Sequence, residues 1–215
     1  QSLSFSMEQP LKNGAWLDTD GTIHMAYRGI DAPIMHRSEI AMLGDHNVEN
    51  YLAAIAAVWG YVSMDSIKRV AHEFKGVEHR LEFSGEVDGV KYYNDTEATN
   101  IKCTQIALSS FNNPTIIILG GLERGQDFNE LTPYMKNVKA VLAIGECRKR
   151  VEDYAKSLKI PVYTHEFLKD AMKEIEGIKK SGDVVLLSPA SASWDQYKEC
   201  EIRGKEFKDF VKELK

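Results

Sequence analysis

A serine-rich segment follows the last apolar run of the chain and has the composition of an anion-binding turn. Residues 185–197 read Val-Leu-Leu-Ser-Pro-Ala-Ser-Ala-Ser-Trp-Asp-Gln-Tyr, so a strand signal leads directly into three hydroxyl groups. Ser193, with Gln196 three residues later, has the spacing of a capping box and predicts a helix start. The first turn of a helix holds unpaired N–H groups and the positive end of the dipole, so it can receive a carboxylate or a phosphate. An ordinary strand-to-helix connection is the alternative.

Two further polar segments also follow apolar runs. Residues 94–100 read Asn-Asp-Thr-Glu-Ala-Thr-Asn, in which Asp95 could accept two hydrogen bonds from a ribose diol and Thr99 offers a hydroxyl beside a helix start. Residues 120–127 read Gly-Gly-Leu-Glu-Arg-Gly-Gln-Asp. The glycines allow a ligand to approach the backbone, and Arg124 offers a planar fork suited to a carboxylate or a phosphate. The alternatives are a plain capped helix start and a surface arginine.

Earlier in the chain, two amides and one arginine have spacings that suit a nucleotide. Asn47 and Asn50 lie three positions apart at the start of a predicted helix, so they share one face. Amide side chains can pair with the donor and acceptor edge of a purine, and capping accounts for one asparagine more readily than for both. Arg80 could reach a phosphate. Its alternative is a surface ion pair with Glu82 or Glu78.

The composition is that of an ordinary globular protein and limits the partners. The chain has 215 residues, is 43% hydrophobic and carries a formal net charge of −5, which argues against nucleic acid as the main partner. The 3 cysteines are widely spaced and have no metal-binding pattern, so we expect a cytoplasmic protein without structural zinc. No apolar run approaches the length of a membrane span, and no signal peptide is visible, so we expect no membrane partner.

From residue 94 onward, strand signals alternate with segments of helix length. Strands are predicted over residues 115–119, 140–144, 161–163 and 183–187, and helices over 99–109, 129–136, 146–157, 168–179 and 193–214. This alternation predicts an α/β fold with a mostly parallel sheet and helices on both faces. Ligands of such sheets bind where strands end and helices begin, so the three polar segments would lie at one edge of the sheet.

The first 76 residues have a different pattern. We expect short β-structure in the first 35 residues, with a hairpin turn at 18–21, then helices from Asp45 and over 66–74. Lys75-Gly76 marks a domain boundary, after which strands at 80–84 and 90–93 are linked by Asp-Gly. Residues 1–6 already alternate like a strand and lack an initiator Met, so we expect residues 1–215 to be the C-terminal part of a longer protein.

Taken in order, five segments resemble the motifs of the Mur ligases, the ATP-dependent ligases of peptidoglycan synthesis. They match H-N-x-x-N-x-x-A-A, H-R-x-E, N-D-S-K-A-T-N, L-G-G-x-x-[KR]-x-x-[DE]-F and L-S-P-A-x-A-S-x-D-Q-[FY], at residues 46–54, 79–82, 94–100, 119–128 and 187–197. The last segment resembles the branch that adds D-glutamate. Together the segments span nearly the whole chain, so the resemblance is specific.

The resemblance implies two domains and a nucleotide site. Residues 1–76 would be the α+β C-terminal part of the central ATP-binding domain, and residues 77–215 the complete Rossmann-like domain that carries the incoming amino acid. Asn47 and Asn50 would hold the adenine of ATP. Arg80 would meet its phosphates and Asp95 its ribose.

The resemblance also implies the reaction. Thr99, Arg124 and Ser193 would receive the carboxylates of D-glutamate, whose amine attacks an acyl phosphate made from UDP-N-acetylmuramoyl-L-alanine and ATP. The phosphate loop and the Mg²⁺ ligands would lie in a region upstream of this chain, which itself contains no complete catalytic set and no metal site. We therefore expect the chain alone to be inactive. We also expect the protein to be a monomer.

Two positions depart from the family pattern and leave an alternative open. Glu97 stands where the motif often has a lysine, and Cys200 where some members have an aromatic residue near the substrate. A standalone module that binds a nucleotide or an acidic ligand without catalysis is therefore the second hypothesis. A nicotinamide-dependent dehydrogenase would fit the strand–helix alternation, but the sequence contains no G-x-G-x-x-G.

Overall fold

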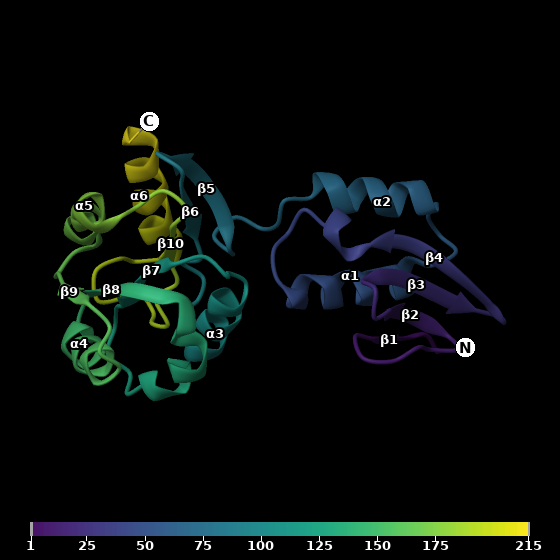
Figure 1. The fold of residues 1–215 in the computed structure, drawn as a ribbon, viewed down its shortest axis with the longest axis horizontal. Helices are drawn as coiled ribbons and strands as arrows, with labels where there is room; N and C mark the ends of the chain where they lie inside the picture. Colours follow the sequence, from purple (N-terminus) through teal and green to yellow (C-terminus); the bar gives the residue numbers. More distant parts are fainter. Residues whose placement is uncertain (1, 215) are drawn as a thin grey trace. The chain divides into compact units, whose positions relative to one another are not determined.

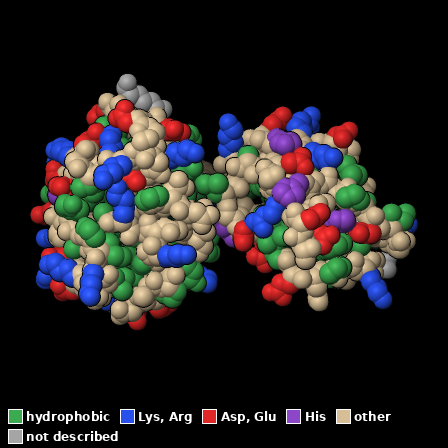
Figure 2. Space-filling model, in the orientation of Figure 1, with side chains coloured by type: hydrophobic (Ala, Val, Ile, Leu, Met, Phe, Trp, Pro, Cys, Tyr) green, Lys and Arg blue, Asp and Glu red, His purple; other side chains and the backbone are tan. Residues whose placement is uncertain are grey.

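The computed structural model describes residues 2–214. The chain forms two compact units, Gln1–Gly76 and Val77–Lys215, coloured purple to blue and blue to yellow in Figure 1. No helix within residues 2–214 is both long enough and apolar enough to cross a membrane. On the face drawn in Figure 2, acidic and basic side chains are interspersed over each unit.

The first unit contains a four-stranded sheet in the order β1-β2-β3-β4. Its strands are β1 (Ser4–Ser6), β2 (Gly14–Leu17), β3 (Thr22–Tyr27) and β4 (Ile30–His36). The predicted hairpin is confirmed, because β2 and β3 pair antiparallel across a turn closed by Gly21 N–H donating to the Asp18 carbonyl, 3.0 Å. The predicted N-terminal strand is shorter, and its first residue, Gln1, lies outside the described residues.

Two helices cover this sheet. They are α1 (Asp45–Val58) and α2 (Met64–Glu73), and a short 3-10 helix η1 (Arg37–Glu39) follows β4. Leu52 and Ile55 of α1 pack with Ile23 of β3 in a shared core. Ser63 caps α2 by accepting a hydrogen bond from Ser66 N–H.

The second unit is built on a six-stranded sheet in the order β5-β6-β10-β7-β8-β9. Its strands are β5 (Glu82–Val87), β6 (Val90–Asn94), β7 (Thr115–Gly120), β8 (Val138–Ile144), β9 (Val162–Thr164) and β10 (Val184–Leu187). Only the edge strand β5 is antiparallel to its neighbour, and the remaining pairs are parallel. The predicted mostly parallel α/β sheet is confirmed.

Helices lie on both faces of this sheet. The face of α3 (Ile101–Ser109) also carries the 3-10 helix η2 (Phe128–Asn137) and α4 (Arg148–Ser157), whereas α5 (Leu168–Ile178) and α6 (Cys200–Glu213) cover the other face (Figure 1). Along β7, Ile117 and Leu119 belong to the first core and Ile116 and Ile118 to the second. A strand covered on both sides is apolar at every position, which is why its sequence does not alternate.

The helix predicted from Ser193 is wrong at its start. Residues 188–199 form a loop, and α6 begins at Cys200, after Glu199, without a side-chain cap. The Gln196 side chain instead donates from Nε2 to the Glu166 carbonyl, 2.5 Å away. The Ser193 hydroxyl caps nothing, and its own carbonyl closes the local turn by accepting from the N–H groups of Gln196 and Tyr197.

A second helix prediction is wrong in the type of helix. The helix predicted over 129–136 is the 3-10 helix η2, which contains Pro133. Proline has no N–H to donate and clashes with the preceding turn of an α-helix, so a regular α-helix is disfavoured there. The other predicted helices of this unit are present, with boundaries that differ by one or two residues.

Candidate functional site

Three polar loops leave the same edge of the sheet, from three adjacent strands. β10, the last strand in the sequence, lies between β6 and β7, with Leu187 opposite both Asn94 and Ile118. The segments after β6, β10 and β7 therefore start side by side at the carboxyl ends of parallel strands. This is where ligands of open α/β sheets bind.

Backbone hydrogen bonds join these three loops. Asp95 N–H donates to the Leu187 carbonyl at 2.8 Å, and Gly120 N–H donates to the Pro189 carbonyl at 2.9 Å. Leu122 N–H donates to the Ala192 carbonyl at 2.8 Å. The middle loop, which carries the serines, is thus held from both sides.

Asp95 lies at the floor of this edge and is buried, 7% exposed. One carboxylate oxygen accepts from the Ser188 hydroxyl at 2.7 Å and the other from Leu81 N–H at 3.1 Å. Burial raises the pKa of Asp95 to about 6, although these two hydrogen bonds and Arg80 favour the charged form. Both oxygens that could contact a ribose already have a partner, so Asp95 supports the local loop geometry whether or not it binds a nucleotide.

The raised pKa makes the stability of the second unit depend on pH. A carboxyl group whose pKa is higher in the folded state stabilises the fold when protonated, so its contribution is complete below about pH 4 and is lost as the pH rises through about 6. The difference between this pKa and the ordinary pKa of an aspartate corresponds to about 3 kcal/mol. We expect the free energy of unfolding of the wild type, relative to Asp95→Asn, to fall by up to this amount between pH 4 and 7. Urea denaturation at a series of pH values measures it, and parallel curves for the two proteins would contradict it.

Ser193 and Thr99 are held on neighbouring loops. Ser193 is 1% exposed, and its hydroxyl has no hydrogen-bond partner among residues 2–214. Thr99 is partly buried, and its N–H donates to the Glu97 carbonyl at 2.8 Å. A buried hydroxyl without a partner costs free energy, so it is a feature to explain by function or by a ligand.

Arg124 reaches the serine loop through an aromatic contact. Its guanidinium lies 4.7 Å from the centroid of the Trp194 ring, which is 63% exposed. A cation–π contact of this kind orients a flexible arginine. The structure therefore brings Arg124 to the segment that contains Ser193, although the two residues lie far apart in the sequence.

Glu97 and Cys200, the two residues that depart from the motif pattern, lie next to each other. The Cys200 thiol lies 3.7 Å from a carboxylate oxygen of Glu97, and the other oxygen lies 3.6 Å from Arg80. The alternative that pairs Arg80 with Glu78 or Glu82 is wrong, because Lys208 contacts both of those carboxylates. Arg80, 65% exposed, instead pairs with Glu97.

Two groups of side chains within residues 2–214 have the spacing of metal ligands. One consists of Glu78, His79 and Glu82, and Lys208 already occupies its two carboxylates. The other consists of Glu97, Cys200 and Glu201. Burial and the neighbouring carboxylates raise the pKa of Cys200 to about 11, so this thiol is protonated at neutral pH and is a poor metal ligand there.

The amide pair of the first unit lies on α1 as predicted. Asn50 Nδ2 donates to Asn47 Oδ1 at 3.3 Å, and Asn47 Nδ2 donates to the Leu43 carbonyl at 2.7 Å. Asn50 is exposed and Asn47 partly buried, so both remain near the surface. The shared helix face is confirmed, and the role of the pair in binding adenine stays a prediction.

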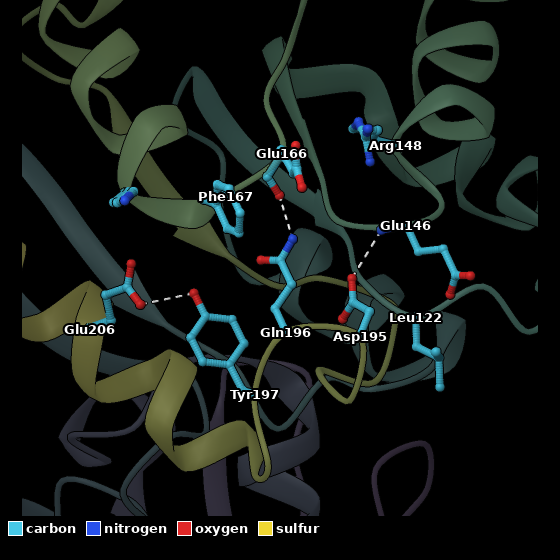
Figure 3. A pocket seen from close by; sticks show the side chains of 10 residues that line it. Leu122, Glu146, Arg148, Glu166, Phe167, Asp195, Gln196, Tyr197 and Glu206 are labelled. Atoms are coloured by element: carbon cyan, nitrogen blue, oxygen red, sulfur yellow. Dashed lines mark hydrogen bonds between the residues drawn. The ribbon is translucent and has the colours of Figure 1, made fainter.

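A cavity of about 870 Å³ lies beside this edge, toward β8 and β9. Figure 3 shows Asp195, Gln196 and Tyr197 of the serine loop in its wall, where they hydrogen bond to Glu146 N–H, the Glu166 carbonyl and the Glu206 carboxylate. Thr99, Arg124 and Ser193 are not among its lining residues. The cavity thus flanks the three loops and is separate from the predicted amino-acid site.

Sequence reasoning gave no role to Arg203, which lies beneath the loops. This arginine occupies a helix position whose i+4 and i+8 neighbours, Phe207 and Val211, are buried. A charged residue in register with an apolar stripe is the signal that could have identified it.

Comparison with known proteins identifies related sequences. Residues 79–191 match the family model described as "Mur ligase, glutamate ligase domain". Three relatives named UDP-N-acetylmuramoylalanine--D-glutamate ligase come from Shouchella clausii, Enterococcus hirae and Bacillus subtilis. They are 43%, 44% and 43% identical over 96%, 99% and 98% of this chain. The chain covers 45%, 46% and 46% of those proteins, which is about half of their length.

Solved structures share the fold at lower identity. UDP-N-acetylmuramate-alanine ligase MurC from Thermotoga maritima matches 98% of this chain and 48% of its own, with a TM-score of 0.62 and 16% identity. MurF ligase from Thermotoga maritima, in complex with ADP, matches 93% of this chain and 45% of its own, with a TM-score of 0.58 and 17% identity. At these identities the likeness concerns the fold.

Proposed function

The chain belongs to the Mur ligase family, and on that premise we propose that it is the C-terminal portion of an ATP-dependent ligase that adds D-glutamate to UDP-N-acetylmuramoyl-L-alanine. Residues 1–76 would be the end of the central ATP-binding domain, and residues 77–215 the amino-acid-binding domain. The observation that carries the proposal is the insertion of β10 between β6 and β7, because it aligns the loops that bear Thr99, Arg124 and Ser193.

The amino-acid site would recognise two carboxylates. Arg124 can pair with one of them in a bidentate contact, and the hydroxyls of Thr99 and Ser193 can donate hydrogen bonds to the other. The unpartnered Ser193 hydroxyl supports this role, since a carboxylate would satisfy it. D-Glutamate held in this way presents its amine to the acyl phosphate, and positioning supplies most of the rate enhancement.

The nucleotide contacts are proposed residue by residue. Asn47 and Asn50 have surface amides that suit adenine, and the exposed guanidinium of Arg80 suits a phosphate. Asp95 would contact the ribose through the small part of its carboxylate that is exposed. We place the Mg²⁺ ligands and the phosphate loop in the remainder of the longer protein. Bound Mg²⁺ would neutralise charge on the transferred phosphate.

One observation favours a second candidate, a binding module without catalysis. Glu97 pairs with Arg80 and thus opposes the cation that would meet the phosphates of ATP. A module that had lost the phosphate-transfer step could tolerate this pair. It would bind an acidic ligand at the same three loops.

The test is an assay of the longer protein and of the 215-residue chain. We expect the longer protein to release phosphate from ATP only when both D-glutamate and UDP-N-acetylmuramoyl-L-alanine are present. The chain alone should release none, because we place the groups that form the acyl phosphate in the remainder of the longer protein. L-Glutamate is the control amino acid. A longer protein that binds D-glutamate but releases no phosphate would favour the binding module. Activity of the chain alone would contradict the proposal that the acyl phosphate is formed by the remainder of the longer protein.

A further inference from the structure

Arg203 is a buried cation without a carboxylate partner. It lies in the first turn of α6, is 1% exposed, and forms no ion pair within residues 2–214. Burial lowers its pKa to about 10, so it remains charged at neutral pH. Burying a charge is unfavourable unless hydrogen bonds or an opposite charge compensate it. Its position near a helix N-terminus adds to the cost, because that end of the dipole is positive.

The guanidinium instead joins two of the three loops. Its Nε donates to the Thr96 hydroxyl at 2.9 Å, and its Nη2 donates to the carbonyls of Thr96 and Ser191, at 3.0 and 3.2 Å. The Thr96 hydroxyl in turn donates to the Cys200 carbonyl at 2.8 Å. A planar fork can hold such divergent acceptors at the same time, whereas a lysine ammonium has a single nitrogen at the end of a flexible stem.

The remaining nitrogen of Arg203 faces the third loop. Nη1 has no hydrogen-bond partner among the described residues. A Cβ atom added to Gly121 would lie 3.2 Å from it, so this nitrogen sits against Gly121, the first residue after β7. Arg203 therefore contacts the loops after β6 and β10 by hydrogen bonds and the loop after β7 by proximity, and no carboxylate within residues 2–214 forms an ion pair with it.

We propose that Arg203 is a positioning residue that sets the spacing between the loops carrying Thr99 and Ser193 and supplies the positive charge that makes their site selective for an amino acid with two carboxylates. The identity of the ligand rests on the proposed function, whereas the loop spacing does not. Three of its hydrogen bonds go to Thr96 and Ser191, so Arg203 acts through these loops and through its field. A charge in a poorly screened interior acts over several ångströms, which is the range between a loop floor and its ligand.

Two substitutions separate the effect of the divergent hydrogen bonds of Arg203 from the effect of its charge. Arg203→Lys keeps the charge and loses the divergent hydrogen bonds, and Arg203→Met loses both. Lys139→Met is the matched control, because Lys139 is a partly buried cation of the same unit that pairs with Asp183 at 2.6 Å, away from the loops. Each variant is made in the 215-residue chain, and amide hydrogen exchange of residues 95–99 and 190–193 is followed by NMR. Binding is measured with D-glutamate and with D-glutamine, which has one carboxylate fewer.

In Arg203→Met we expect exchange in both loops to quicken about tenfold or more, because each loop loses a hydrogen bond from a charged donor. The preference for D-glutamate over D-glutamine should fall on the order of tenfold. Arg203→Lys should quicken exchange but retain most of the preference. Lys139→Met should change neither quantity. If Arg203→Met does not fold, Arg203→Lys alone decides the role of the fork through the exchange rates.

The outcomes distinguish this inference from the proposed function. Unchanged loop exchange in Arg203→Lys, together with an unchanged D-glutamate preference in Arg203→Met, would overturn the inference while leaving the proposed function in place. If the wild type binds no D-glutamate but the loops respond as expected, the proposed ligand is wrong and the positioning role stands. A merely structural arginine would lower stability without changing the ratio of the two affinities.

Discussion

Replacing Ser193 by alanine is expected to weaken D-glutamate binding about tenfold to a hundredfold without lowering stability. A hydrogen bond from a hydroxyl to a carboxylate contributes about 1.5–3 kcal/mol, which corresponds to that range. In the free protein the hydroxyl is buried and has no partner within residues 2–214, so its removal breaks no hydrogen bond. The free energy of unfolding should stay the same or rise by up to about 1 kcal/mol. The KM for D-glutamate of the longer ligase and urea denaturation of the chain measure the two effects.

Ser188→Ala on the same loop is the control. Ser188 is also buried, but its hydroxyl contacts the Asp95 carboxylate at 2.7 Å and the Thr104 hydroxyl at 3.1 Å. Its removal should lower stability by about 1–3 kcal/mol and should affect the KM for D-glutamate less than Ser193→Ala does. If Ser193→Ala lowers stability and leaves the KM unchanged, Ser193 does not belong to the site.

Replacing Gly121 by alanine is expected to lower the free energy of unfolding of the second unit by about 2–6 kcal/mol. Gly121 has a φ of +149°, which is unfavourable for a residue with a side chain. Its added Cβ would overlap the carbonyl oxygen of Ala192, a backbone atom that accepts the Leu122 hydrogen bond and cannot easily move. The range combines about 1–3 kcal/mol of backbone strain with about 1–3 kcal/mol of overpacking. Denaturation followed by NMR signals of residues 77–214 measures it.

Gly125→Ala in the same loop separates strain from overlap. Gly125 also has a positive φ, +72°, but an added Cβ there meets no atom within 4 Å. This substitution should cost only about 1–2 kcal/mol. Equal losses for the two variants would mean that the close approach of the loops after β7 and β10 has no energetic importance.

The positions of the strands follow from local sequence patterns. The run Ile116–Leu119 is apolar throughout, and the structure buries it between two helical layers. The Asp-Gly and turn signals place both hairpins correctly, since glycine meets the backbone requirement of a tight turn without any distant contact. β4 is the exception: its sequence contains Pro33, and its strand geometry comes from pairing with β3.

The start of α6 shows where local patterns fail. Ser193 and Gln196 have the spacing of a capping box, but Gln196 is drawn to the Glu166 carbonyl and Asp195 to Glu146 N–H, both from loops near β8 and β9. The side chains therefore join neighbouring loops, and the helix begins seven residues later, at Cys200. Hydrogen-bond partners that are distant in the sequence decided the boundary.

The sequence by itself determined the family, the α/β class and the loops that carry the candidate residues, because these depend on residue types and spacings within short segments. Only the tertiary structure decided which loops are neighbours, since β10 must be inserted between β6 and β7 before the serine loop can meet the other two. It also decided that Glu97 pairs with Arg80 and that Arg203 lies buried beneath the site. Contacts of this kind join residues about 100 positions apart, such as Arg203 and Thr96, and they arise only when the chain packs.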